Sequence, residues 1–139
     1  MKKMSEVTQV EGWKEIDDEN DPDSISLRVI PDHTVVYEIS GPMFFAAAGK
    51  ILEISFKEDT RFLVIRMRSV NAIDATALHS LEQLYEDCRK RNITIILSHV
   101  NEQPMQAFAK AGFDQMIGRD NFCPHIDDAL SRAKELGGR

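Results

Sequence analysis

The 139-residue sequence lacks the features that mark several large classes of protein. Its two cysteines, Cys88 and Cys123, are too few and too far apart for a disulfide framework or a zinc site, which favours a reducing compartment. No apolar run approaches the roughly 18 residues of a membrane span, and the polar N-terminus has no secretory signal. The net charge of −6 argues against general nucleic-acid binding. The length and composition predict one globular domain, with no nucleic-acid partner and no structural metal.

The common catalytic and cofactor motifs are missing as well. The sequence contains no phosphate-binding loop, no dinucleotide-binding glycine motif after a strand and no nucleophile elbow, and its four histidines do not have the spacing of metal ligands. Cys88 lies on the apolar stripe of a predicted helix and is expected to pack as a small hydrophobe. Cys123 lies near a helix start, where the helix dipole could lower its pKa, but no partner base can be named. We therefore predict no catalytic residue, no metal and no cofactor.

The acidic residues are concentrated at the start of the chain. Residues 1–24 contain three lysines against eight Asp and Glu, whereas residues 25–139 are nearly neutral. Residues 17–23 read Asp-Asp-Glu-Asn-Asp-Pro-Asp, and mutual repulsion predicts an extended linker. A calcium loop is the alternative, but the central Gly and the terminal Glu of such a loop are missing. We divide the chain into an acidic leader, residues 1–24, and a domain, residues 25–139.

Hydrophobic patterning predicts an α/β fold for that domain. Two alternating runs around Pro31-Asp32-His33 predict a β-hairpin, and two continuous apolar runs predict strands buried on both faces. The expected strands are 26–30, 34–39, 62–65, 93–97 and a short one at 115–117. The expected helices are 44–56, 75–91, 101–111 capped by Asn101, and a last one that starts near Pro124. Alternation of helices and strands predicts a mixed, mostly parallel sheet with the hairpin at one edge and helices packed on it.

The segment 69–78, which connects a buried strand to the longest helix, is the candidate site. Asp74 suits the N-cap, since its carboxylate can accept hydrogen bonds from the first backbone N–H groups of the helix. A capped helix with no further role is one interpretation. The other is functional, because loops at the carboxyl ends of strands form the binding sites of open α/β sheets. The small residues Ala75, Thr76 and Ala77 would leave this helix end open to a partner or an anion.

Three segments, in this order, resemble the STAS domain found in anti-sigma-factor antagonists and in the cytoplasmic tails of SulP (sulfate permease) anion transporters. Residues 41–48 read Gly-Pro-Met-Phe-Phe-Ala-Ala-Ala, and residues 73–82 read Ile-Asp-Ala-Thr-Ala-Leu-His-Ser-Leu-Glu. Residues 122–130, Phe-Cys-Pro-His-Ile-Asp-Asp-Ala-Leu, are similar to the last helix of the family. The resemblance covers residues 25–139 and implies a STAS-like fold. The leader more loosely resembles the juxtamembrane segment that follows the last membrane span of such transporters.

The resemblance also bears on phosphorylation of the candidate site. In the antagonists this loop reads Asp-Ser, then Ser or Thr, then Gly, and the first Ser accepts phosphate from a kinase. Here the aligned position is Ala75, which has no oxygen to esterify, so the phosphoacceptor-equivalent position is lost. Thr76 has a hydroxyl but does not align with the usual acceptor, and Ala77 stands where Gly is usual. These departures favour the transporter branch of the family.

The resemblance implies a non-enzymatic regulatory domain of a SulP-type secondary anion transporter. Its partner would be the transmembrane domain of the same transporter, with a cytosolic regulatory protein or a second copy of the chain as further candidates. The domain would lie on the cytoplasmic side of the inner or plasma membrane, and as an isolated fragment it is expected to be soluble. Two alternatives remain open at this point: a free-standing antagonist that binds a kinase or sigma regulator, and a nucleotide or anion sensor.

Overall fold

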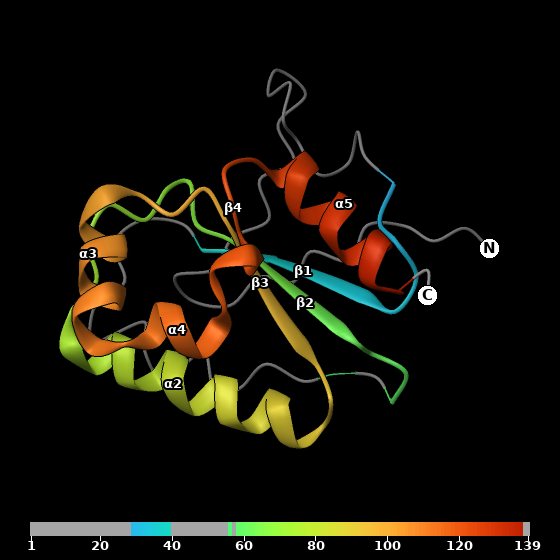
Figure 1. Ribbon diagram of the computed structural model, residues 1–139, viewed down its shortest axis with the longest axis horizontal. Helices are drawn as coiled ribbons and strands as arrows, with labels where there is room; N and C mark the ends of the chain where they lie inside the picture. The colour runs from blue at the N-terminus through green and yellow to red at the C-terminus, as the bar shows by residue number, and fades with distance from the viewer. Residues whose placement is uncertain (1–28, 40–55, 57, 138–139) are drawn as a thin grey trace.

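The computed structural model describes residues 29–39, 56 and 58–137. This part of the chain contains four strands and five helical segments (Figure 1). The strands are β1 (Thr34–Glu38), β2 (Phe62–Arg66), β3 (Thr94–Ser98) and β4 (Phe122–Cys123). The helices are α2 (Ala75–Lys90), α3 (Glu102–Ala111), α4 (Phe113–Ile117), the short 3-10 turn η2 (Arg119–Asn121) and α5 (Ile126–Gly137).

The four strands form one parallel sheet in the order β1-β2-β3-β4. In its register Val36 pairs with Val64, and Val64 pairs with Ile96. All five residues of β1 and all five of β2 are buried, as expected of strands covered on both faces. The predicted α/β class with a mostly parallel sheet is therefore confirmed.

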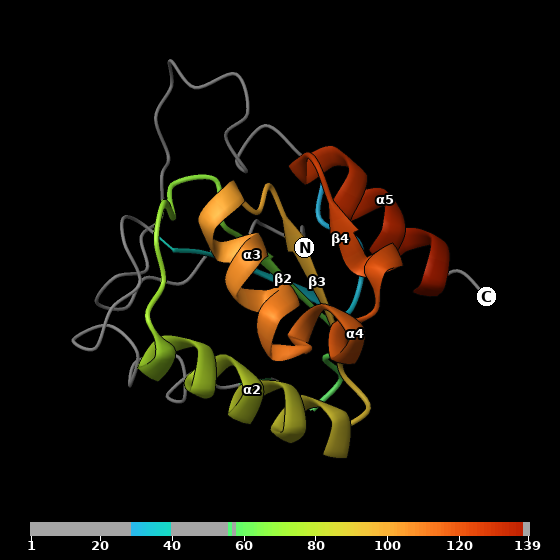
Figure 2. The same cartoon turned by 60° about the vertical axis from the view of Figure 1, so that its left-hand side comes forward.

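The helices cover the two faces of the sheet unequally. In both views α2, α3 and α4 lie on one side of the strands and α5 lies on the other (Figures 1 and 2). Side chains of α2, α3 and α4, among them Leu81 and Phe108, pack against Leu63 and Ile95 in the larger core. Four apolar residues of α5 are all buried in a second, smaller core: Ile126, Ala129, Leu130 and Ala133.

One predicted strand is wrong. Residues 115–117 belong to α4, and the last strand is the two-residue β4, Phe122–Cys123. Phe113 and Ile117, four residues apart, both face the larger core, and this helical spacing buries them together. Gly112, with φ of 81°, ends α3 in the left-handed conformation and lets α4 begin at the next residue.

Several predictions fall on other parts of the chain. The predicted helix 44–56 lies outside the described residues except for Phe56, and the predicted strand 26–30 lies outside them except for Val29 and Ile30, which have no regular structure. The leader and the boundary after residue 24 also lie outside the described residues. The antiparallel edge of the sheet and the division into two parts therefore stay predictions.

Candidate functional site

The predicted site begins where β2 ends. Residues 67–74 run from the carboxyl end of β2 to the N-cap of α2, and we refer to this segment as the β2–α2 loop. Asp74 occupies the N-cap of α2 with extended backbone angles, and its Oδ1 accepts a hydrogen bond of 2.9 Å from the backbone N–H of Ala77. The predicted capping role of Asp74 is confirmed. Since the same bond is made by any well-capped helix, it does not by itself indicate a ligand.

The three small residues after Asp74 have different surroundings. Ala75 and Thr76 are exposed in the first turn of α2, so the Thr76 hydroxyl and the methyl group of Ala75 are both open to a partner. Ala77 is fully buried in the larger core. Its small side chain lets α2 approach the sheet, but Ala77 offers no surface to a ligand. The surface of the site is thus formed by Asp74, Ala75 and Thr76.

Two side chains from the start of α3 hold the β2–α2 loop. Asn101 Nδ2 donates hydrogen bonds to the backbone carbonyls of Arg68 (3.2 Å) and Val70 (2.8 Å). Gln103 Oε1 accepts the backbone N–H of Ile73 at 3.0 Å, and Gln103 Nε2 lies 3.5 Å from the Ile73 carbonyl oxygen. Asn101 is the N-cap residue of α3, as predicted, although its side chain makes no capping hydrogen bond. Its amide group instead donates hydrogen bonds to two backbone carbonyls of the loop.

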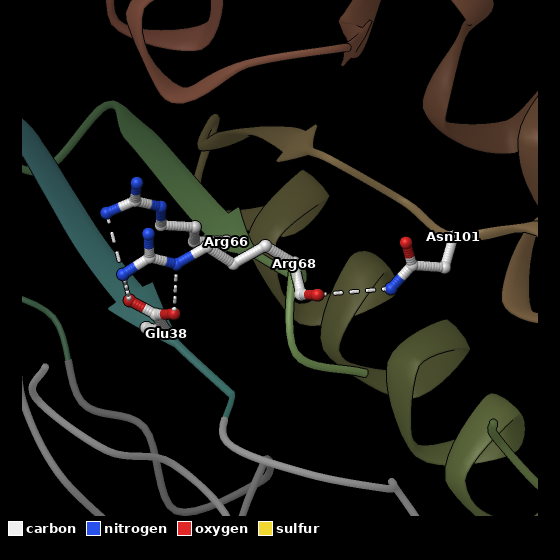
Figure 3. A network of polar contacts seen from close by, with 4 residues as sticks. All are labelled: Glu38, Arg66, Arg68 and Asn101. Carbon is white, nitrogen blue, oxygen red and sulfur yellow. Dashed lines mark hydrogen bonds and ion pairs between the residues drawn. The ribbon is translucent and has the colours of Figure 1, made fainter. Parts of the chain in front are cut away.

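A buried group of charges lies at the same end of β1 and β2 (Figure 3). Arg68 Nε donates to Glu38 Oε2 at 2.8 Å, and Arg66 Nη1 lies 3.8 Å from Glu38 Oε1. Glu38 and Arg66 are only 3% and 2% exposed, so both charges are removed from water. Buried charges need partners, because an isolated one is strongly destabilising. Glu38 therefore fixes Arg68, whose carbonyl is in turn bound by Asn101.

The roles of Glu38 and Gln103 were not predicted from the sequence. Glu38 lies at the end of one apolar run, and Arg66 and Arg68 lie at the end of the next. Opposite charges at the ends of two neighbouring parallel strands are a signal that could have indicated the pair. Gln103 has no such signal, because its contact with Ile73 depends on how α3 packs.

A crevice opens beside the start of α3. From β3 the chain turns to the α3 side of the sheet, whereas from β4 it turns to the α5 side, and ligands of open α/β sheets bind at such points. The crevice has a volume of about 510 Å³, and its lining includes His99, Asn101, Met105 and Cys123. The start of α3 is thus shared between this crevice and the β2–α2 loop.

Neither cysteine has the environment of a reactive thiol. Cys88 is buried in the larger core, and burial raises its pKa from 9.0 to about 12, with a smaller contribution from Asp87. Burial and then Asp128 raise the pKa of Cys123 as well. The expectation that a helix dipole could lower the Cys123 pKa is therefore wrong, since removal from water outweighs the dipole.

The described residues do not contain a group of three or more His, Cys, Asp or Glu side chains placed to hold a metal ion. Within the same ranges, no helix has the length and apolar character needed to cross a membrane. The arrangement at the β2–α2 loop is that of a rigid surface feature. It combines a capped helix end, two exposed small side chains and a backbone held by α3 and by the Glu38 charge group.

Comparison with known proteins agrees with this description. The family model of the STAS domain matches residues 24–129. A crystal structure of a sulfate transporter family protein from Wolinella succinogenes is 36% identical and has a TM-score of 0.80, covering 86% of this chain and all of the other. The STAS domain of a SulP transporter from Vibrio cholerae is 32% identical, with a TM-score of 0.69 over 80% of this chain and 89% of the other.

The curated relatives are much longer proteins. "Probable sulfate transporter 4.2" of Arabidopsis thaliana is 27% identical over 111 residues, which is 69% of this chain but only 16% of that protein. The chain therefore spans about one sixth of the length of this relative. From the match of the family model and the two solved structures, the chain belongs to the STAS domain family, and the STAS domains it resembles include those of SulP-type transporters.

Proposed function

We propose that this chain is a regulatory docking domain of a SulP-type anion transporter, acts on the cytoplasmic side of the membrane and performs no chemistry of its own. The main support is the β2–α2 junction, where Ala75 and Thr76 are exposed on a capped and firmly held helix end. Ala75 occupies the position at which antagonists of the family accept phosphate, and it has no hydroxyl. The surface is therefore suited to a permanent contact rather than to one switched by phosphorylation at this position.

The proposed partner is the transmembrane part of the same transporter. A docked domain changes transport only if its contact free energy differs between the transport states, because a contact of equal strength in both states shifts neither. The β2–α2 loop and the first turn of α2 are well suited to such a contact, since a surface that is already ordered loses little entropy on binding. The acidic leader, residues 1–24, would then connect the domain to the membrane part, and anionic lipid headgroups would repel it.

The test is anion flux through the full-length transporter that contains this sequence, with sulfate as the first anion. Deleting residues 25–139 is expected to lower or deregulate flux. Thr76→Arg should have the same kind of effect, because it places a long cation on the docking surface. Ser131→Arg is the matched control: Ser131 is also an exposed hydroxyl residue, but it lies on α5 across the sheet. If the deletion changed neither flux nor the amount of transporter in the membrane, the regulatory role would be wrong.

Phosphorylation assays distinguish the transporter domain from a free-standing antagonist. Incubation with a kinase and ATP cannot place phosphate on Ala75, and the transporter proposal predicts no stoichiometric phosphate on Thr76. Stoichiometric phosphorylation of Thr76 that is lost in Thr76→Val would favour the antagonist. No phosphorylation, together with a flux effect of Thr76→Arg, would favour the transporter domain.

A further inference from the structure

The polar groups of the β2–α2 loop are bound from a distant part of the chain. The carbonyls of Arg68 and Val70 and both backbone groups of Ile73 face two side chains, Asn101 and Gln103. These side chains are separated from their partners by 30 to 33 residues in sequence. Within the loop itself, the Val70 N–H donates to the Met67 carbonyl at 3.0 Å.

We propose that Asn101 and Gln103 are positioning residues, which set the conformation of the β2–α2 loop and so the way Asp74, Ala75 and Thr76 are presented to a partner. The part concerning the partner rests on the docking function proposed above. The part concerning the loop rests only on the four contacts.

The chemistry of the two side chains fits this role better than a role within α3. Asn101 stands at the N-cap of α3, where its side chain would ordinarily cap that helix, yet its amide donates to the loop. Gln103 is exposed and could have been fully solvated, but it pairs with the backbone of Ile73 in both directions. The hydrogen bonds described for both side chains go to the loop and not to α3. A movement of the start of α3 would therefore be passed directly to the loop.

The loop is anchored on its other side as well. The Arg68 side chain is held by Glu38 on β1, while the Arg68 carbonyl is held by Asn101. Ile73, at the far end of the loop, is buried in the larger core and held by Gln103. The segment just before Asp74 is thus fixed at both ends, and within this anchorage Gln103 is exposed and Asn101 is partly exposed.

Hydrogen exchange of the 139-residue chain tests the positioning. The reporters are the amides of Val70 and Ile73, whose N–H groups are bound to Met67 and Gln103. Gln103→Met removes both contacts with Ile73, and roughly three- to tenfold faster exchange at Ile73 is expected from the loss of one hydrogen bond. Gln103→Glu keeps an oxygen that accepts the Ile73 N–H, so it should restore most of the protection.

Asn101→Asp gives the second comparison. An Asp at this position still suits an N-cap, but it cannot donate to the Arg68 and Val70 carbonyls, so faster exchange at Val70 with unchanged protection inside α3 is expected. Gln106→Ala is the control, because Gln106 is an exposed glutamine on the same helix, and its side chain donates to Glu102 rather than to the loop. Unchanged exchange at Val70 and Ile73 in Gln103→Met and Asn101→Asp would overturn the positioning role.

Flux through the full-length transporter separates this inference from the docking function. If Gln103→Met speeds exchange at Ile73 and alters flux in the direction of Thr76→Arg, both are supported. If exchange rises and flux does not change for either variant, the loop is positioned as inferred but the docking function is wrong. If Thr76→Arg alters flux while Gln103→Met leaves exchange unchanged, docking stands and the positioning role fails.

Discussion

Replacement of Glu38 by Gln tests whether the buried charge group stabilises the carboxyl end of the sheet. The change keeps the size of the side chain and removes its negative charge. Arg66 Nη1 lies 3.8 Å from the Glu38 carboxylate and Arg68 Nε lies 2.8 Å from it, and Arg66 is only 2% exposed. The positive charges of Arg66 and Arg68 would then lose the negative charge of Glu38 that balances them.

The size of the effect follows from burial. Removing one partner of a buried ion pair typically costs about 3–5 kcal/mol, because the remaining charge stays out of water. The Arg68 side chain is 19% exposed and can be partly hydrated, which places the expected loss for Glu38→Gln near the lower end, at about 3 kcal/mol. For a domain of this size that corresponds to a fall in Tm of roughly 10 °C.

The assay is urea unfolding followed by circular dichroism, with Glu86→Gln as the matched control. Glu86 is an exposed glutamate on α2, and its replacement should change the free energy of unfolding by less than about 0.5 kcal/mol. If Glu38→Gln were no more destabilising than Glu86→Gln, the charge group would contribute nothing measurable. The anchorage of Arg68 described above would then be incorrect.

Three further predictions concern the helix ends and the thiols. Asp74→Ala should destabilise the domain by about 1 kcal/mol through loss of the α2 cap, while Asp74→Asn should be nearly neutral, as measured by thermal unfolding. Gly112→Ala should cost about 1–2 kcal/mol in urea unfolding, because φ is 81° and a Cβ is strained in this conformation. Gly112→Asn should cost less, because Asn adopts positive φ more readily and no atom lies within 4 Å of the added Cβ. Cys88 should react slowly with a thiol reagent at pH 8 until the protein is unfolded. Because folding raises its pKa from 9.0 to about 12, its stabilising contribution is complete below pH 9 and is lost between pH 9 and pH 12, and Cys88→Ala should flatten that dependence. Equal alkaline loss in the Cys88→Ala variant would contradict this.

Local chemistry made part of the fold predictable. A capping residue and a 3.6-residue repeat are read within one segment, so the N-cap at Asp74 and the course of α2 were both predicted. The buried strands were predicted for the same reason, because a continuous apolar run bounded by charges is typical of strands covered on both faces.

What depends on contacts between distant segments could not be predicted. Residues 115–117 were assigned to a strand because three residues do not distinguish strand from helix, and the packing of Phe113 with Ile117 on the core decides for helix. Asn101 is the N-cap residue of α3, as predicted, but its side-chain amide donates to the loop before Asp74 instead of making a capping hydrogen bond. Opposite charges at the ends of two apolar runs point to a partnership of Glu38 with Arg68, but the pairing itself depends on the register of the two strands, which no local pattern gives.

Photo-crosslinking in the proposed full-length transporter tests the proposed docking function most directly. A photoreactive amino acid at position 76 is expected to crosslink to the membrane part, with a yield that changes when an anion gradient shifts the transporter between its states. The same amino acid at position 131, on the opposite face of the sheet, should give little crosslinking to that part. No crosslink from position 76, or equal yields from positions 76 and 131 in every state, would contradict the account.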